Sequence, residues 1–224
     1  MTEATSPTPA KAGIWEDFID IFFQPSQVFE RRREGQFGLA LLILVVLSTA
    51  LYFALRNGLA PIMDAEMSRQ AAAMLEKNPE MTAEQLATAQ GFMEKVAMFG
   101  TVIFIPLGVL IGAALLWLAG RIFDAKVAFA AAMMIVTYSQ LPKIVEMVLS
   151  ALQGLFLEPE AITSRYSVTL GIARFLDPDT NPFVLTLIGG LDLFTIWVYV
   201  LMAIGLSIVA RVPMQRAALA VAAT

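Results

Sequence analysis

Cysteine and histidine are both missing from this sequence of 224 residues. Without cysteine there are no disulfides, thiolate nucleophiles or cysteine-bound metals. Without histidine the chain lacks the commonest general base and a common metal ligand. No carboxylates at working spacing within an apolar segment and no Ser/Lys dyad replace them. We therefore expect no catalytic residues, no metal, no other cofactor and no enzyme activity.

Charged residues are scarce, and acidic residues slightly outnumber basic ones. Charged residues make up only 15% of the chain, whereas about a quarter is typical of soluble domains. The formal net charge of -4 leaves no basic face to neutralise phosphates, which argues against a nucleic-acid partner. Hydrophobic residues make up 58%, and the mean hydropathy is +0.72. This balance indicates an integral membrane protein, whose first partner is the lipid bilayer.

Four segments are long and apolar enough to cross a bilayer, since about 20 helical residues span a hydrocarbon core of about 30 Å. They cover residues 37–56, 97–120, 127–157 and 183–210. The predicted fold class is therefore an all-α integral membrane protein with four transmembrane helices. A fifth span or a re-entrant segment at 164–176 stays open, because that stretch is short and charged.

The N-terminal region divides into a tail and a helix. Residues 1–13 are polar and rich in Pro, Ser and Thr, which predicts a disordered tail rather than a signal peptide. In residues 14–36, apolar side chains recur at helical spacing with acids opposite, ahead of the basic run "RRR". We expect an amphipathic helix, with two positions open: the membrane interface, or the cytoplasmic side of the protein itself.

Two further regions lie outside the membrane in this scheme. Residues 57–96 are rich in helix formers and carry Thr82 and Gln85 at capping-box spacing. They predict an extracytoplasmic helical hairpin that turns near Asn78-Pro79 and whose second arm runs into the second span. Residues 211–224 are expected to form a cytoplasmic tail.

Lysine and arginine near the span ends set the orientation. Seven such residues flank one side of the four spans and two flank the other. The richer side carries Arg31, Arg32, Arg33, Arg121, Lys126, Arg211 and Arg216, and the poorer side Arg56 and Lys95. Both termini are therefore predicted to be cytoplasmic, in the cell membrane or, for a bacterial protein, the inner membrane.

Three charged residues interrupt the predicted spans. Lys143 and Glu146 lie in the third span and Asp192 in the fourth, at similar depths from the outer face. Since an intramembrane charge normally faces a partner or a cavity, we expect a polar pair of Lys143 with Asp192, shared by Glu146. Three roles are open: fixing two helices in register, lining an ion or substrate path, or, for Asp192, capping a helix broken at Gly189-Gly190.

Small residues and prolines mark further features of the spans. Gly108 and Gly112 form a GxxxG motif, which predicts helix packing inside the protein or, alternatively, homodimerisation. Pro106 and Pro142 each remove a backbone hydrogen bond and are expected to kink their spans. The polar residues that precede Pro142 can satisfy the freed carbonyls, with a substrate site as the second reading.

Three stretches of the chain carry a family resemblance. They are "FFQPSQVFE" before the first span, "TYSQLPKIVEMVL" in the third and "LDLFTIWVYVLMAIGLSIV" in the last. Together they resemble the Yip-domain family of Ypt/Rab-interacting membrane proteins, over most of the chain. The resemblance implies a helical polytopic membrane protein with a cytoplasmic N-terminus and no known enzymatic activity.

The chain also departs from the eukaryotic members of that family. Those members usually have five spans and a longer cytosolic N-terminal region that engages Rab GTPases. This chain has a short N-terminal region and no "DLYGP"-like stretch of the kind they carry. Rab binding is therefore not carried over, and the resemblance is to a bacterial-type member.

These features favour a non-catalytic scaffold that organises the membrane or binds a partner, either another membrane protein or a second copy of this chain. The alternative is a transporter, or an accessory subunit of a membrane export complex, that uses Lys143 and Asp192. An intramembrane enzyme ranks last, because the sequence offers no catalytic constellation.

Overall fold

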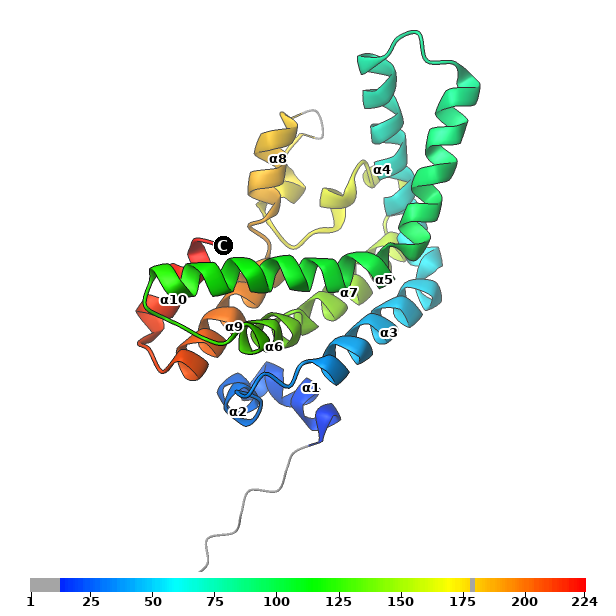
Figure 1. Cartoon of the computed structure of the whole chain (residues 1–224). Coiled ribbons are helices and arrows are strands. Elements are labelled where there is room, and N and C mark those ends of the chain that lie inside the picture. Colours follow the sequence, from blue (N-terminus) through cyan, green and yellow to red (C-terminus); the bar gives the residue numbers. More distant parts are fainter. Residues whose placement is uncertain (1–12, 178–179) are drawn as a thin grey trace, which may run out of the picture.

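The computed structural model describes residues 13–177 and 180–224, so the predicted disordered tail, apart from Gly13, lies outside the described residues. Over these ranges the chain is helical, with one isolated β-bridge and no strand, which confirms the all-α class (Figure 1). The α-helices are α1 (Ile14–Phe23), α2 (Pro25–Arg31), α3 (Gly38–Ala54), α4 (Arg56–Lys77), α5 (Ala83–Ile122), α6 (Phe129–Ser139), α7 (Leu141–Phe156), α8 (Pro182–Gly189), α9 (Leu193–Ala210) and α10 (Met214–Ala222). Three short 3₁₀ helices follow α7: η1 (Pro159–Ala161), η2 (Arg165–Val168) and η3 (Ile172–Phe175).

Helix length and composition identify two membrane spans in the described chain: Phe99–Ile122 within α5, and Leu193–Ala210, which is α9. A third results if α3 and α4, which meet at a bend of 86°, form one broken span. The predicted four are not reached on this criterion, because α3 alone is slightly too short and the third predicted span is divided at Gln140. The fourth predicted span is divided at residues 190–192, and only its second part, α9, qualifies. Segment 164–176 holds only η2 and η3, which are far too short to form a fifth span.

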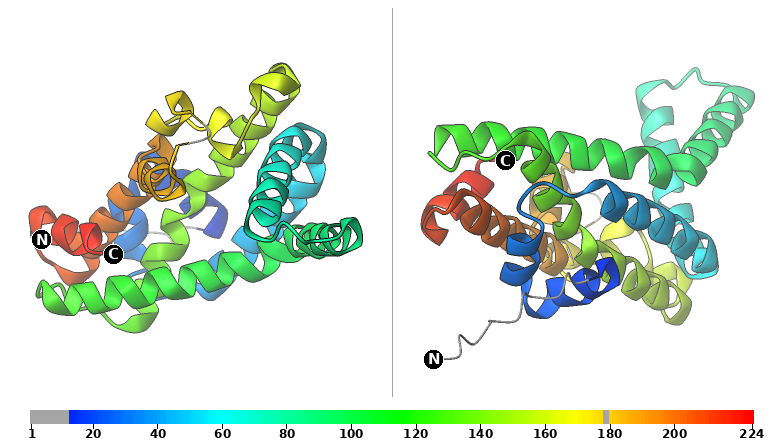
Figure 2. Two further views of the ribbon diagram at one scale, coloured as in Figure 1. Left: turned by 90° about the horizontal axis from the view of Figure 1, so that it is seen from above. Right: turned by 60° about the horizontal axis from the view of Figure 1, so that its bottom comes forward.

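Helix α6 forms the centre of the bundle, because its side chains from Ala131 to Ser139 are all buried. Helices α5 and α9 both pack against it. Figure 2 shows the apolar part of α5 running along one side of the molecule, with α10 at one end and the α4–α5 hairpin at the other. These three helices contribute several of the largest core side chains, among them Leu116, Met134, Ile135, Leu201 and Leu206.

The N-terminal helices α1 and α2 form a small hairpin that packs against the bundle. The Phe18 ring meets Tyr138 of α6 edge to face, with centroids 6.1 Å apart, and Phe22 meets Trp197 of α9 at 5.5 Å. The opposite face of α1 is exposed and apolar, and it carries Trp15, Ile19 and Phe23 one turn apart. Helix α1 therefore combines features of both predicted positions, with one face on the protein and another suited to lipid.

A buried cluster of charges joins α1 to α2. The carboxylate of Asp17 is fully buried and lies 2.8 Å from the Arg31 guanidinium and 2.6 Å from that of Arg32. Asp20 adds a second contact to Arg31, at 2.6 Å. Burial alone lowers the pKa of Arg31, but the hydrogen bond to Asp20 and the charges of both acids outweigh burial and raise the pKa above its ordinary value. Arg31 and Arg32, which belong to the basic run before α3, thus hold α1 and α2 together.

The substitution Asp17→Ala is expected to lower the free energy of unfolding by about 2 kcal/mol, because it leaves two arginines without their shared buried partner. The effect stays below that of a fully buried pair, since both guanidinium groups are about a quarter exposed to solvent. Thermal unfolding in detergent micelles measures it. Glu16→Ala, on the exposed side of the same turn, serves as the control and should change stability by less than about 0.5 kcal/mol. Equal effects of the two substitutions would contradict the role given to Asp17.

Helix α4 and the first part of α5 form a hairpin that projects away from the bundle (Figure 1). Thr82 and Gln85 form the capping box that their spacing predicts, with the Gln85 backbone N–H donating to Thr82 Oγ1 over 3.2 Å and the Thr82 N–H donating to Gln85 Oε1 over 2.9 Å. At its base, α4 lies directly on α7. Gly58 meets Ala151 and Gly154 there so closely that a Cβ on either glycine would overlap the facing backbone.

Helix α10 was not predicted from the sequence, since residues 211–224 were expected to form a tail. It packs against α9 and α5 and buries Ala217, Ala220 and Val221. Its apolar stripe is built mostly of alanine, which is too weak a signal to separate a docked helix from a solvated one.

Candidate functional site

The first half of the site is the gap between α8 and α9, where Asp192 is the N-cap residue of α9. Its Oδ1 atom accepts hydrogen bonds from the backbone N–H groups of Phe194, over 2.9 Å, and Thr195, over 3.1 Å. The Thr195 hydroxyl donates to the other carboxylate oxygen, Oδ2. The carboxylate is therefore held by the free N–H groups of a helix that starts inside the predicted fourth span, in the manner of an N-cap.

The outer loop is pinned to the same gap. The Leu193 backbone N–H donates to the Leu170 carbonyl over 3.1 Å, and Gly171 forms the isolated β-bridge with Asp192. A Cβ on Gly171 would lie 2.9 Å from the Asp192 Cα and the Leu191 carbonyl oxygen, so only glycine fits this approach. The loop thus covers the capped end of α9.

The second half of the site is the break between α6 and α7. Helix α6 ends at Ser139, α7 begins at Leu141, and Pro142 lies in the first turn of α7, where its missing N–H costs little. Lys143 follows directly and reaches α9. Its ammonium donates to Thr195 Oγ1 over 2.8 Å and lies 3.7 Å from Asp192 Oδ2. The structure thereby brings the two breaks together.

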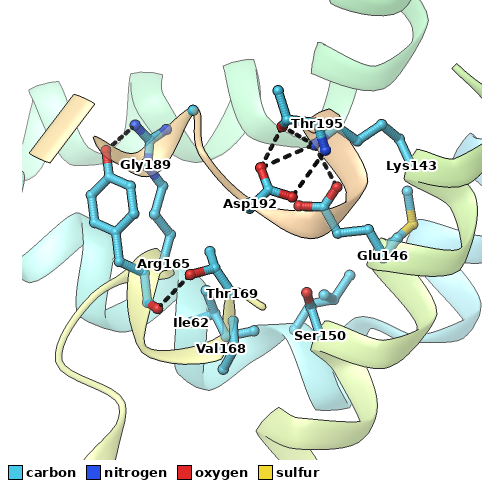
Figure 3. A pocket seen from close by; sticks show the side chains of 14 residues that line it. Ile62, Lys143, Glu146, Ser150, Arg165, Val168, Thr169, Gly189, Asp192 and Thr195 are labelled. Carbon is cyan, nitrogen blue, oxygen red and sulfur yellow. Dashed lines mark hydrogen bonds and ion pairs between the residues drawn. The ribbon is translucent and has the colours of Figure 1, made fainter. Parts of the chain in front are cut away.

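Glu146 completes the group, because its Oε2 atom lies 2.6 Å from the Lys143 ammonium on the same face of α7. Figure 3 shows Lys143, Glu146, Asp192 and Thr195 meeting at one side of a cavity. The cluster holds one cation and two carboxylates. All three residues that the sequence singles out as an intramembrane polar pair therefore share one site.

The cavity has a volume of about 490 Å³, within the range of small-molecule sites. Leu59 and Ile62 of α4 form one wall, so the base of the hairpin borders the site. Arg165 of η2 lies across the cavity from the charged cluster (Figure 3). Its guanidinium donates to the Tyr166 hydroxyl over 2.8 Å, and among the described residues no carboxylate lies within 4.0 Å of it. The cavity therefore presents a cation opposite an acidic cluster.

Arg165 and Tyr166 belong to no recognisable motif, so neither could be selected from the sequence alone. The Tyr166 ring packs on Gly189, where a side chain would collide with it.

Within the described ranges, no group of three or more acidic side chains lies close enough together to bind a divalent metal ion.

The other residues singled out in the sequence are divided between core and surface. Gly112 faces the core, and a Cβ there would lie 3.3 Å from Val136 of α6. Gly108 faces open space and makes no close helix contact. Helix α5 continues through Pro106 without interruption. Among the described glycines, Gly58 and Gly154 lie closest to the backbone of a neighbouring helix, and neither belongs to a GxxxG motif.

The apolar surface that the helices leave uncovered defines the class of protein. The face of α5 that points away from α6 exposes a stripe of apolar side chains: Val102, Ile103, Leu110, Ile111 and Leu118. Exposure of such a stripe is unfavourable in water and favourable in contact with lipid. Long apolar helices and a charged group at facing helix breaks are typical of a polytopic α-helical membrane protein.

The chain belongs to the Yip1 domain family, whose model matches residues 19–224, nearly the whole chain. This match confirms the resemblance seen in the sequence. The family consists of membrane proteins and is not known for enzymatic activity. No curated protein and no solved structure matches the chain.

Proposed function

We propose that this protein is a non-catalytic membrane scaffold that binds a partner protein through the α4–α5 hairpin. One observation carries the proposal: none of the described side chains between Leu59 and Phe99 is buried. Helices gain most of their stability from burying an apolar face. Two helical arms that project from the bundle, with no buried side chain among their described residues, are therefore suited to packing against another protein.

The hairpin offers a partner both apolar and charged contacts. Leu75, Phe92 and Val96 are its exposed large apolar side chains. Around the turn lie the exposed acids Glu76, Glu80 and Glu84, with Lys77 as the single basic residue among them. A partner surface with an apolar centre and a basic rim complements this arrangement.

The base of the hairpin supports the same proposal. The direct backbone contact of Gly58 with Ala151 and Gly154 fixes the direction in which α4 leaves the bundle. Because small residues allow this close approach, α4 and α7 pack as one unit. A rigid mount of this kind reduces the ordering cost of binding.

We further propose that the hairpin lies on the extracytoplasmic side of the membrane and both termini in the cytoplasm. Arg121, at the cytoplasmic end of α5 in this scheme, lies 3.8 Å above the Trp117 ring centroid. An aromatic and a basic side chain at a helix end form the usual anchor at a membrane interface. Transport has less support, because the polar atoms of Lys143 and Asp192 are engaged with one another and with Thr195.

Site-specific photo-crosslinking in native membranes tests the scaffold proposal. A photoreactive amino acid at Phe92 is expected to capture one stoichiometric protein, and the same probe at Leu219, which is also well exposed but on α10, should not. Adding Leu75→Glu in the hairpin should reduce the capture at least about tenfold, since it places a charge in the apolar contact. Identical capture from both positions, or capture unaffected by Leu75→Glu, would contradict the proposal.

A further inference from the structure

A second cavity lies on the other side of Lys143. It has a volume of about 450 Å³ and is bordered by α3, α5 and the start of α7. Lys143 and Met147 line both this cavity and the polar one described above, so the two are neighbours across these side chains. The second cavity is mainly apolar, with walls that include Leu44, Phe104 and Ile105.

This groove has the length and setting of an acyl-chain site. It follows α5 from Gly100 to Val109, roughly 14 Å of helix at about 1.5 Å per residue. At Gly108 it is open, because no atom lies within 4 Å of the position that a Cβ would take. Within a bilayer, a groove of this kind gains dispersion contacts when a lipid chain fills it.

The polar cavity supplies groups of both signs for a lipid headgroup. Lys143 is already engaged by Glu146, Asp192 and Thr195. Arg165 is the cation on the other wall, and a guanidinium suits phosphate through its fork of donors. The cluster opposite has two carboxylates for one ammonium, so its surplus negative charge complements a second, incoming ammonium group. Phosphate and ammonium together are the charges of a zwitterionic phospholipid.

We propose that the two cavities together bind one zwitterionic phospholipid of the phosphoethanolamine type. Its phosphate lies at Arg165, its ammonium faces Glu146, and one of its acyl chains occupies the groove between α3 and α5. The site is separate from the partner-binding surface of the hairpin, although the base of α4 forms one of its walls. Failure of the crosslinking experiment at Phe92 leaves this inference standing.

Native mass spectrometry of the full chain tests the headgroup. After exchange into detergent with equal amounts of phosphatidylethanolamine and phosphatidylglycerol, one phosphatidylethanolamine per chain is expected to stay bound. Arg165→Ala should weaken this binding at least about tenfold, as expected for loss of a charged hydrogen bond. Lys126→Ala, which removes a well-exposed cation elsewhere, is the matched control and should have no effect.

The acyl-chain arm uses phosphatidylethanolamine with a diazirine in the chain. Crosslinks are expected on the α5 segment from Thr101 to Val109, and Gly108→Phe should abolish them by filling the groove. Gly91→Phe, at an equally open glycine in the hairpin arm, should leave them unchanged. Equal retention of the two lipids together with unchanged binding by Arg165→Ala would overturn the proposal and indicate surface lipid only. Displacement of the lipid by millimolar inorganic phosphate would equally contradict it, since the groove would then contribute nothing.

Discussion

Asp192→Ala is expected to destabilise the protein by about 4 kcal/mol, the largest effect of any single substitution considered for this chain. The Asp192 side chain is 6% exposed and is held by two backbone N–H groups, the Thr195 hydroxyl and the Lys143 ammonium. The substitution removes the N-cap of α9 and part of the neutralising charge around Lys143 at once. Chemical or thermal unfolding in detergent measures the loss.

Two companion substitutions separate the cap from the ion pair. Asp192→Asn keeps an acceptor for the N–H groups of α9 but loses the charge, so we expect roughly half of the effect of the alanine substitution. The cycle of Asp192→Ala with Lys143→Ala should show a coupling energy of at least about 1 kcal/mol, as expected for residues in contact. Glu30→Ala, in the exposed pair with Arg33, is the control and should cost less than about 0.5 kcal/mol. Strictly additive effects of the two core substitutions would rule out the pair.

Gly154→Ala is expected to lower stability by about 3 kcal/mol, although alanine is the better helix former. The added Cβ would overlap the Gly58 carbonyl oxygen, and it would lie 3.0 Å from the Gly58 carbonyl carbon. A backbone atom cannot rotate away as a side chain can, so α4 must move off α7. The cost therefore lies at the upper end of what overpacking usually causes.

The control for this substitution is Gly91→Ala, at a helical glycine of the hairpin with no atom within 4 Å of the added Cβ. Relief of the glycine entropy should make that variant more stable by about 0.5–1 kcal/mol. Circular dichroism melts of both variants in the same detergent provide the comparison. Similar melting temperatures for Gly154→Ala and the unaltered protein would show that α4 and α7 are not in backbone contact.

Composition and the length of the apolar runs were enough to predict the fold class, because the bilayer leaves helices as the main solution for a chain of this hydropathy. Lys143 and Asp192 were also predicted to be partners, because they lie at similar depths in the predicted spans. The structure places their charged atoms 3.7 Å apart. Both predictions rest on properties of single sequence segments. The average hydropathy of a segment predicts a span, and a charge within a span requires a partner.

The helix breaks were harder to locate. Hydropathy averages over a window, so it reports 127–157 and 183–210 as continuous runs. The structure interrupts the first at Gln140 and the second at residues 190–192. The break at Asp192 is stable because its own carboxylate satisfies the N–H groups that the gap sets free. Capping was one of three roles that the sequence left open for Asp192, and only three-dimensional contacts select among them.

The contact between α4 and α7 was out of reach of sequence reasoning. Gly58 and Gly154 are single glycines far apart in the chain, and neither is part of a GxxxG motif, whereas Gly108 in the GxxxG motif makes no close contact. A small-residue motif identifies helices that are able to pack closely, and tertiary structure decides which glycine is used. Arg165 was not identified from the sequence either, because an arginine in a loop belongs to no hydrophobic periodicity or spaced motif.

We expect the bundle to span the bilayer with the hairpin on the extracytoplasmic side and the C-terminus in the cytoplasm. Because the chain has no cysteine, single introduced cysteines test this orientation directly. Asn78→Cys at the hairpin turn and Thr224→Cys at the C-terminal residue each introduce the only thiol of the chain. With a membrane-impermeant maleimide on intact cells, we predict labelling of Asn78→Cys at once and of Thr224→Cys only after permeabilisation. Labelling of both variants in intact cells, or of Thr224→Cys alone, would contradict the account.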